Sequence, residues 1–180
     1  MSTVCRGFSA LVAAAAICIL SIPAGTTPAA ARGEIVPFRG EASAGTIVVR
    51  TNERRLYLVL GEGRALSYPV GVGRAGRQWA GRSVISGKHV RPAWAPPPDI
   101  ARARPNLARV HEGGSPSNPM GAAALTLSGG EYAIHGTNDP SSIGGFVSYG
   151  CIRMHNHDIT DLYGRVSIGT TVIVLSLIHI

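Results

Sequence analysis

The sequence has few cysteines, few acidic residues and few aromatic residues. Of its 180 residues, 3 are cysteines, 6% are aromatic and 15% are charged, with 10 Asp and Glu against 17 Lys and Arg. Three cysteines cannot all pair within one chain, so their positions matter more than their number. A hydrophobic content of 45% is not that of a disordered chain, and the length fits one domain.

The first 31 residues have the pattern of a secretory signal. Arg6 is the only charged residue before the apolar run 11–20, which is too short to span a bilayer comfortably. Residues 28–31 offer a small-residue cleavage site. A bulky residue precedes Cys18, which disfavours a lipoprotein anchor there. We expect residues 1–31 to be removed, which predicts an exported protein of the periplasm or cell wall without a stable membrane anchor.

From residue 46 onward the sequence has the pattern of short β-strands. The runs 55–60 and 65–70 flank a turn that contains glycine, which predicts a hairpin. Residues 91–119 hold seven of the 12 prolines and are expected to be mostly irregular. The predicted strands are 46–50, 55–60, 65–70, 83–85, 124–127, 132–135 and 170–175.

One segment has helical periodicity, and Asn156 or Asp158 can cap its N-terminus. The residues that share a face at 3.6-residue spacing are Ile159, Leu162, Tyr163 and Val166. Many short strands and one or two short helices predict a mostly β domain over residues 46–175. Residues 32–45 are interpreted as a leader into this domain, and 176–180 as a tail that is either an edge strand or read-through from beyond the native coding region.

Residues 71–76 match the G-x-G-x-x-G pattern of dinucleotide-binding loops. That fingerprint requires a helix at its end, so that the pyrophosphate meets the helix N-terminus. Residues 77–81, Arg-Gln-Trp-Ala-Gly, are a poor helix start. We therefore interpret these glycines as relief of crowding in a bent strand or a substrate groove.

The net charge of +7 raises the question of a nucleic-acid partner. The arginines are scattered, however, and the densest cluster, Arg102, Arg104 and Arg109, has no interleaved aromatic residues. In an exported chain this favours attraction to an anionic wall or membrane surface, and we expect no nucleic-acid partner.

His155, His157 and Asp158 raise the question of a metal site. Two histidines at i and i+2 do not share a helix face, and no third strong ligand is spaced nearby. We interpret this segment as a solvated helix N-terminus and predict no metal.

The strongest chemical signal lies in residues 134–154. A cysteine is mostly protonated at neutral pH, so acyl transfer from Cys151 needs a base, and His135 at a strand end is a candidate. Gly150 allows consecutive backbone N–H groups to point at an oxyanion. Arg153 falls on the same side of an extended strand as Cys151, where it can hold a substrate carboxylate. The alternative is a buried cysteine with an unrelated histidine. The residues alone support the two interpretations about equally.

The sequence His135-Gly-Thr-Asn, followed by Ser148-Tyr-Gly-Cys-Ile-Arg-Met154, resembles the active-site signature of the L,D-transpeptidases, the YkuD-type family of bacterial wall enzymes. The similarity extends over about residues 46–175 and includes Asn-Pro-Met-Gly at 118–121. The resemblance implies a β-sandwich-like L,D-transpeptidase catalytic domain that acts on peptidoglycan stem peptides and needs no cofactor.

The resemblance also implies roles for individual residues. Cys151 is the nucleophile, His135 is its base, and the carbonyl of Gly136 orients the histidine. The N–H groups of Cys151, Gly150 and Tyr149 form the oxyanion hole.

Two further residues, Arg153 and Ser148, are expected to bind substrate. One position departs from the pattern, because the family commonly has histidine where this chain has Tyr149.

The implied reaction begins with attack of Cys151 on the L,D bond at the end of a tetrapeptide stem. D-Alanine leaves, and the side-chain amine of a diaminopimelate on another stem resolves the thioester into a 3→3 crosslink. Water as acceptor, in an L,D-carboxypeptidase, and a lipoprotein amine, in an anchoring enzyme, are alternatives on the same site. A catalytically silent wall-binding module is the alternative from another class.

Overall fold

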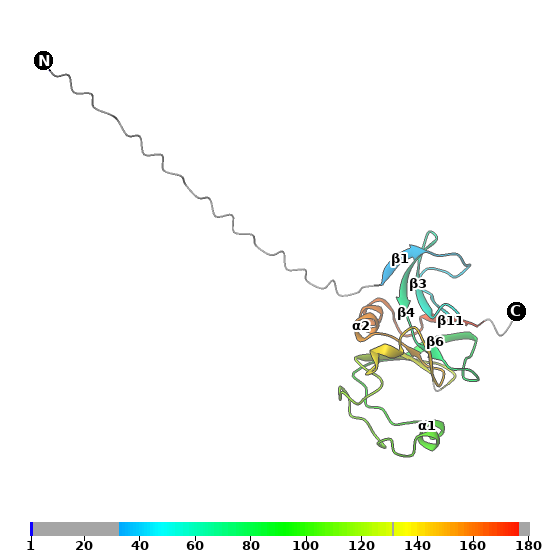
Figure 1. Cartoon of the computed structure of the whole chain (residues 1–180). Coiled ribbons are helices and arrows are strands. Elements are labelled where there is room, and N and C mark those ends of the chain that lie inside the picture. The colour runs from blue at the N-terminus through cyan, green and yellow to red at the C-terminus, as the bar shows by residue number, and fades with distance from the viewer. Residues whose placement is uncertain (2–32, 131, 177–180) are drawn as a thin grey trace.

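The computed structural model describes residue 1, residues 33–130 and residues 132–176 (Figure 1). Apart from residues 1 and 176, the expected signal segment 1–31 and the expected tail 176–180 lie outside these residues. In the described part of the chain, no helix is long and apolar enough to cross a membrane.

The domain is mostly β, as predicted, and its main sheet has the order β1-β4-β3-β2-β11-β6-β7-β8-β10. A separate short pair joins β5 to β9 in parallel. The strands are β1 Glu34–Pro37, β2 Ile47–Arg50, β3 Arg55–Gly61, β4 Arg64–Pro69, β5 Val72–Gly73, β6 Gly81–Val90, β7 Ala123–Leu127, β8 Ala133–His135, β9 Phe146–Ser148, β10 Ile152–Arg153 and β11 Thr171–Leu175. The helices are α1 Pro98–Ala103, the 3₁₀ turn Pro140–Ser142 and α2 Asn156–Arg165.

Strand β6 connects the two halves of the sheet. Its first residues pair with β11, its later residues pair with β7, and the register shifts between Ile85 and Gly87. Such an irregularity bends a strand and increases its twist. The bend lets the two halves enclose one core, to which β2 contributes Ile47 and Val49, both without solvent exposure.

Helix α2 packs against β7 and β8 (Figure 1). Its buried residues Ile159 and Leu162, together with Val166 just after the helix, belong to the core, and Tyr163 packs against it. The helical face predicted from the sequence is therefore confirmed.

Two other features match or extend the sequence analysis. The hairpin β3–β4 forms as predicted, and residues 91–119 are mostly irregular, with the short α1 in a segment that extends away from the sheet (Figure 1). Residues 32–45, expected to be a leader, contain β1, which pairs antiparallel with β4. Residues 34–37 of the expected leader thus belong to the sheet.

The predicted cap of α2 by Asn156 or Asp158 is wrong. His155 occupies the cap position, and no side chain there makes a capping hydrogen bond. Asn156 instead bridges two loops, because its Oδ1 accepts from the N–H groups of Ala122 (3.0 Å) and Thr137 (3.1 Å). Its Nδ2 donates to the Thr137 carbonyl at 2.9 Å.

Two glycines make room for this amide. A Cβ atom on Gly121 or on Gly136 would collide with Oδ1 of Asn156, and Gly121 also has a φ of +65°. The chain that follows β8 is thereby held against the start of α2, which fixes the position of His135.

The bridge and the cap predict different results for Asn156→Asp. Aspartate caps helices well, so a capping role would leave stability unchanged. The bridge loses the Nδ2 donor and gains a carboxylate beside the Thr137 carbonyl. We therefore expect the free energy of unfolding, measured by urea denaturation, to fall by about 1–3 kcal/mol.

Asn52→Asp is the matched control, because Asn52 lies exposed in the turn between β2 and β3. We expect it to change the free energy of unfolding by less than about 0.5 kcal/mol. Equal stability of the two variants would contradict the bridge.

Candidate active site

The parallel pair β8–β10 brings the predicted catalytic residues to one face of the sheet. In its register Ile152 lies beside Ile134, and Arg153 lies beside His135. Side chains alternate along a strand, so His135 and Arg153 share a face, and Cys151, two residues before Arg153, falls on the same face. Ile134 and Ile152 point the other way, into the core.

This face forms the floor of a cleft of about 770 Å³. The segment 91–119, including part of α1, forms one side wall of this cleft. The predicted site residues that line the cleft are Cys151, His135, Arg153, Ser148 and Tyr149. Gly136 and Gly150 adjoin them in the chain.

His135 is buried, and its Nδ1 lies 2.6 Å from the carbonyl oxygen of Gly136. A carbonyl only accepts, so Nδ1 carries the proton and Nε2 of the neutral ring keeps its lone pair. Burial lowers the pKa of His135 to about 4, although the carbonyls of Gly136 and Pro119 act in the opposite direction. The ring is therefore neutral at pH 7, with Nε2 able to accept a proton.

Cys151 is partly buried in the same cleft. Burial raises the pKa of its thiol above the ordinary value, and the Ala133 backbone and the charge of Arg153 offset this only in part. At rest, therefore, Cys151 is a protonated thiol and His135 is a neutral imidazole. The two residues do not form a thiolate–imidazolium pair in this state.

Ser148 closes the turn that presents Cys151. Its hydroxyl donates to the Cys151 carbonyl at 2.6 Å and accepts from the Gly150 N–H at 3.1 Å. The Ser148 hydroxyl, expected to bind substrate, thus bonds to the turn itself. The Gly150 N–H, expected in the oxyanion hole, points at Ser148.

Glycine is the only residue type that fits at position 150. Its φ is +126°, and a Cβ atom would collide with the ring of Tyr132. Trp79 stacks on that ring, with centroids 5.2 Å apart, and donates from Nε1 to the Gly150 carbonyl at 2.9 Å. Sequence analysis missed this aromatic pair, because neither residue lies in a motif.

Two of the glycines in residues 71–76, Gly71 and Gly73, relieve crowding, as interpreted from the sequence, whereas Gly76 has open space around it and a φ of +73°. A Cβ atom on Gly71 would meet the Ser142 carbonyl oxygen at 2.7 Å, and one on Gly73 would overlap the backbone at Arg77. No helix follows the loop. Gly71 also exchanges two backbone hydrogen bonds with Arg153, at 2.8 and 2.9 Å.

Tyr149, the position that departs from the resembled signature, contacts two arginines. The Arg74 guanidinium lies 4.0 Å and that of Arg77 5.5 Å from its ring centroid. Arg77 also pairs with Asp99 of α1 at 3.0 Å. The Tyr149 side of the cleft is thereby linked to the segment 91–119.

The residues weighed as metal ligands make local contacts at the start of α2. The rings of His155 and His157 stack with centroids 5.2 Å apart, and His157 Nε2 lies 3.3 Å from the Asp158 carboxylate. Within residues 33–130 and 132–176, no three His, Cys, Asp or Glu side chains are grouped to hold a metal ion.

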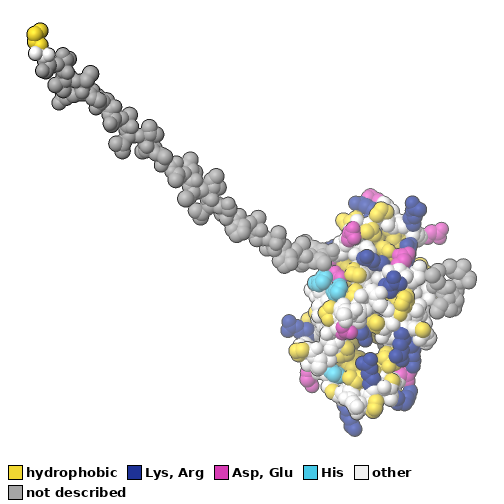
Figure 2. Space-filling view, viewed as in Figure 1, with side chains coloured by type: hydrophobic (Ala, Val, Ile, Leu, Met, Phe, Trp, Pro, Cys, Tyr) yellow, Lys and Arg dark blue, Asp and Glu magenta, His cyan; other side chains and the backbone are white. Residues whose placement is uncertain are grey.

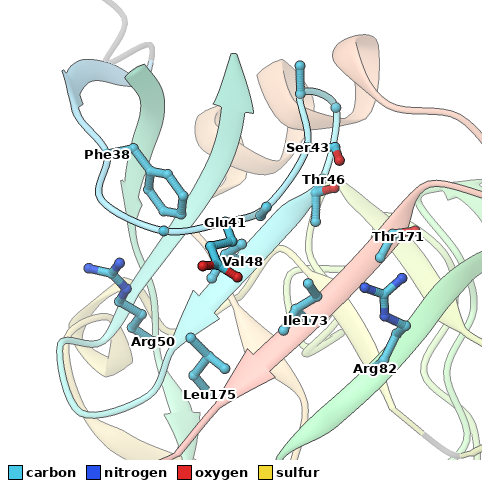
Figure 3. A pocket seen from close by; sticks show the side chains of 14 residues that line it. Phe38, Glu41, Ser43, Thr46, Val48, Arg50, Arg82, Thr171, Ile173 and Leu175 are labelled. Carbon is cyan, nitrogen blue, oxygen red and sulfur yellow. The ribbon is translucent and has the colours of Figure 1, made fainter. Parts of the chain in front are cut away.

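A second hollow, of about 640 Å³, lies on the outer face of the sheet (Figure 3). The loop 38–46 borders it, and the residues on its strand floor include Val48, Arg82, Thr171, Ile173 and Leu175. No cysteine or histidine lines it, so the groups able to carry out acyl transfer are those of the first cleft.

Basic side chains on one face of the domain are mixed with side chains of other types (Figure 2). On the face shown in Figure 2, Lys and Arg are interspersed with hydrophobic and acidic side chains. On this face the distribution agrees with the scatter of arginines along the sequence (Figure 2).

Comparison with known proteins gives consistent results. The family model of the L,D-transpeptidase catalytic domain, YkuD, matches residues 44–174. The probable L,D-transpeptidase ErfK/SrfK of Escherichia coli K12 is 38% identical over 134 residues, which are 70% of this chain and 42% of that protein. The chain thus spans about two fifths of that relative's length.

Solved structures agree in fold. An L,D-transpeptidase from Mycobacterium smegmatis matches with a TM-score of 0.58 at 16% identity, over 72% of this chain and 58% of that one. The catalytic domain of the E. faecium L,D-transpeptidase acylated by ertapenem matches with a TM-score of 0.56 at 20% identity, over 76% of this chain and 100% of that one. With the family match and the arrangement of Cys151, His135 and Arg153, these results establish that the chain belongs to the YkuD family of L,D-transpeptidase catalytic domains.

Proposed function

We propose that the protein is an exported L,D-transpeptidase that crosslinks peptidoglycan stem peptides through a thioester on Cys151. The observation that carries this proposal is the placement of Cys151, His135 and Arg153 on one face of β8–β10, inside a cleft. Removal of residues 1–31 and residence in the periplasm or cell wall belong to the same proposal.

The first half-reaction uses the neutral pair. His135 Nε2 takes the proton of the Cys151 thiol as sulfur attacks the carbonyl carbon of the L,D bond. The carbonyl of Gly136 holds the ring in the required tautomer and stabilises the imidazolium that forms. His135 then gives the proton to the leaving amine of D-alanine, and the acyl group remains on sulfur.

Backbone N–H groups of the turn 149–151 stabilise the oxyanion of this step. We assign this role to the N–H groups of Cys151 and Tyr149. The Gly150 N–H joins them when it leaves the Ser148 hydroxyl and donates to the oxyanion instead. Arg153 has a buried Nε without a hydrogen-bond partner among the described residues. It binds a carboxylate of the donor stem, next to the nucleophile.

The second half-reaction transfers the acyl group to an amine. The side-chain amine of a diaminopimelate on another stem attacks the thioester carbonyl, which gives a 3→3 crosslink and regenerates the thiol. Mass spectrometry of the products from a purified tetrapeptide tests this assignment. Crosslinked dimer supports it, whereas release of free tripeptide alone would identify a carboxypeptidase.

Cys151 is expected to be acylated by a carbapenem. The catalytic domain of the E. faecium L,D-transpeptidase was solved acylated by ertapenem, and the same attack on a strained β-lactam carbonyl follows from the mechanism above. The intact mass of the folded protein should increase by the mass of one carbapenem. Cys151→Ala should keep its mass, and an unmodified parent protein would contradict the proposal.

Loss of the base should slow this acylation strongly. We expect His135→Ala to lower the acylation rate by roughly 10²–10⁴-fold, the usual effect of removing a general base. His155→Ala and His157→Ala, at the start of α2, are the controls and should react at the parent rate. Equal losses in all three variants would contradict the assignment of His135.

The neutral resting pair predicts a distinctive pH dependence. Because burial raises the pKa of Cys151, alkylation by iodoacetamide should accelerate with pH across the neutral range and beyond the ordinary thiol pKa of about 8.5. Because His135 has a pKa of about 4, acylation should not lose its base on acidification from pH 7 to 5. A plateau of alkylation between pH 6 and 8 would instead indicate a thiolate–imidazolium pair.

A further inference from the structure

Arg74 is fixed beside the active-site turn at both ends. Its backbone N–H donates to the Ser148 carbonyl at 3.0 Å, next to the parallel pair of β5 with β9. Its guanidinium lies 4.0 Å from the ring centroid of Tyr149, two residues before the nucleophile. An exposed arginine normally loses much conformational entropy when it binds a ligand, and these contacts reduce that cost in advance.

The charge of Arg74 is not neutralised by the described residues. The other arginine at the Tyr149 ring, Arg77, pairs with Asp99, which also pairs with Arg102. Among residues 33–130 and 132–176, no ion pair with Asp or Glu involves Arg74. A guanidinium that packs on an aromatic ring through its face keeps the N–H groups at its edge for a carboxylate, which it binds with two bonds.

Arg74 lies apart from the region beside Arg153 that is proposed to hold the donor stem. Tyr149, Arg77 and Arg153 line the cleft, whereas Arg74 does not, so it lies at the rim on the Tyr149 side. A donor stem acylated on Cys151 occupies the cleft beside Arg153. A second substrate that enters past Tyr149 meets Arg74 before it reaches the thioester.

We propose that Arg74, positioned by Tyr149, binds a carboxylate of the acceptor stem peptide close to its reacting amine. This inference rests on the proposed function. In the step it assists, the amine nitrogen attacks the thioester carbonyl carbon, the carbon–sulfur bond breaks and a carbon–nitrogen bond forms. The amine proton passes through His135 to the sulfur, so Cys151 returns to the thiol.

The test measures the second half-reaction alone. The thioester is formed from the tetrapeptide and then divided between two acceptors, diaminopimelate and its bis-carboxamide, with both products quantified by mass spectrometry. The carboxylate also changes the basicity of the amine, so the product ratio is compared between variants. We expect Arg74→Gln to lower the preference for the carboxylate acceptor by about tenfold, the low end for a charged hydrogen bond.

Matched variants separate charge from packing. Arg82→Gln removes the same charge from the outer face of β6, at the second hollow (Figure 3), and should keep the parent ratio. Tyr149→Phe keeps the ring under Arg74 and should keep the ratio, whereas Tyr149→Leu should lower it although Arg74 is present. Added salt should reduce the preference of the parent enzyme but not that of Arg74→Gln.

Each outcome decides between the proposals. A parent protein that forms no thioester contradicts the proposed function itself. If the thioester forms but Arg74→Gln keeps the parent ratio, or slows both acceptors equally, Arg74 only packs on Tyr149 and this inference is wrong. A parent thioester that reacts with water and with neither amine also overturns it.

Discussion

The candidate site depends on the parallel pairing of β8 with β10. This pairing sets Arg153 beside His135 and carries Cys151 onto the same face. Strand β10 has only two residues, which is too short to be stable by itself. On its other side Gly71 exchanges two backbone hydrogen bonds with Arg153, so the chain around the nucleophile is held between two neighbours.

The residues around this pairing restrict its movement further. Asn156 fixes the chain after His135, and Ser148 fixes the turn before β10. Trp79 and Tyr132 close over Gly150. None of these contacts touches the groups that exchange protons in the proposed reaction. They hold those groups in place, which matters because catalysis of this kind is sensitive to small displacements.

Much of this arrangement is predictable from the sequence because it is local. Alternation predicts the strands, 3.6-residue spacing predicts the buried face of α2, and the resemblance carried by residues 135–154 indicates which side chains to look for in the site. The errors concern contacts between distant residues. Asn156 has the local pattern of a helix cap, but its partners Ala122 and Thr137 lie 34 and 19 residues away. Strand β1 has no fully buried residue and therefore no hydrophobic pattern to identify it, and only its pairing with β4 shows that it is a strand.

The wall of the cleft formed by residues 91–119 is held by contacts of two different kinds. At the base of the segment the buried Asn118 amide donates to the carbonyls of Pro92, His111 and Glu112, so these bonds join parts of the segment to one another and are shielded from salt. At α1 the attachment is the exposed pair Arg77–Asp99, and such pairs contribute little free energy and are screened by ions. Rising ionic strength therefore weakens the contact between α1 and the Tyr149 side of the cleft, while the bonds of Asn118 at the base of the segment remain.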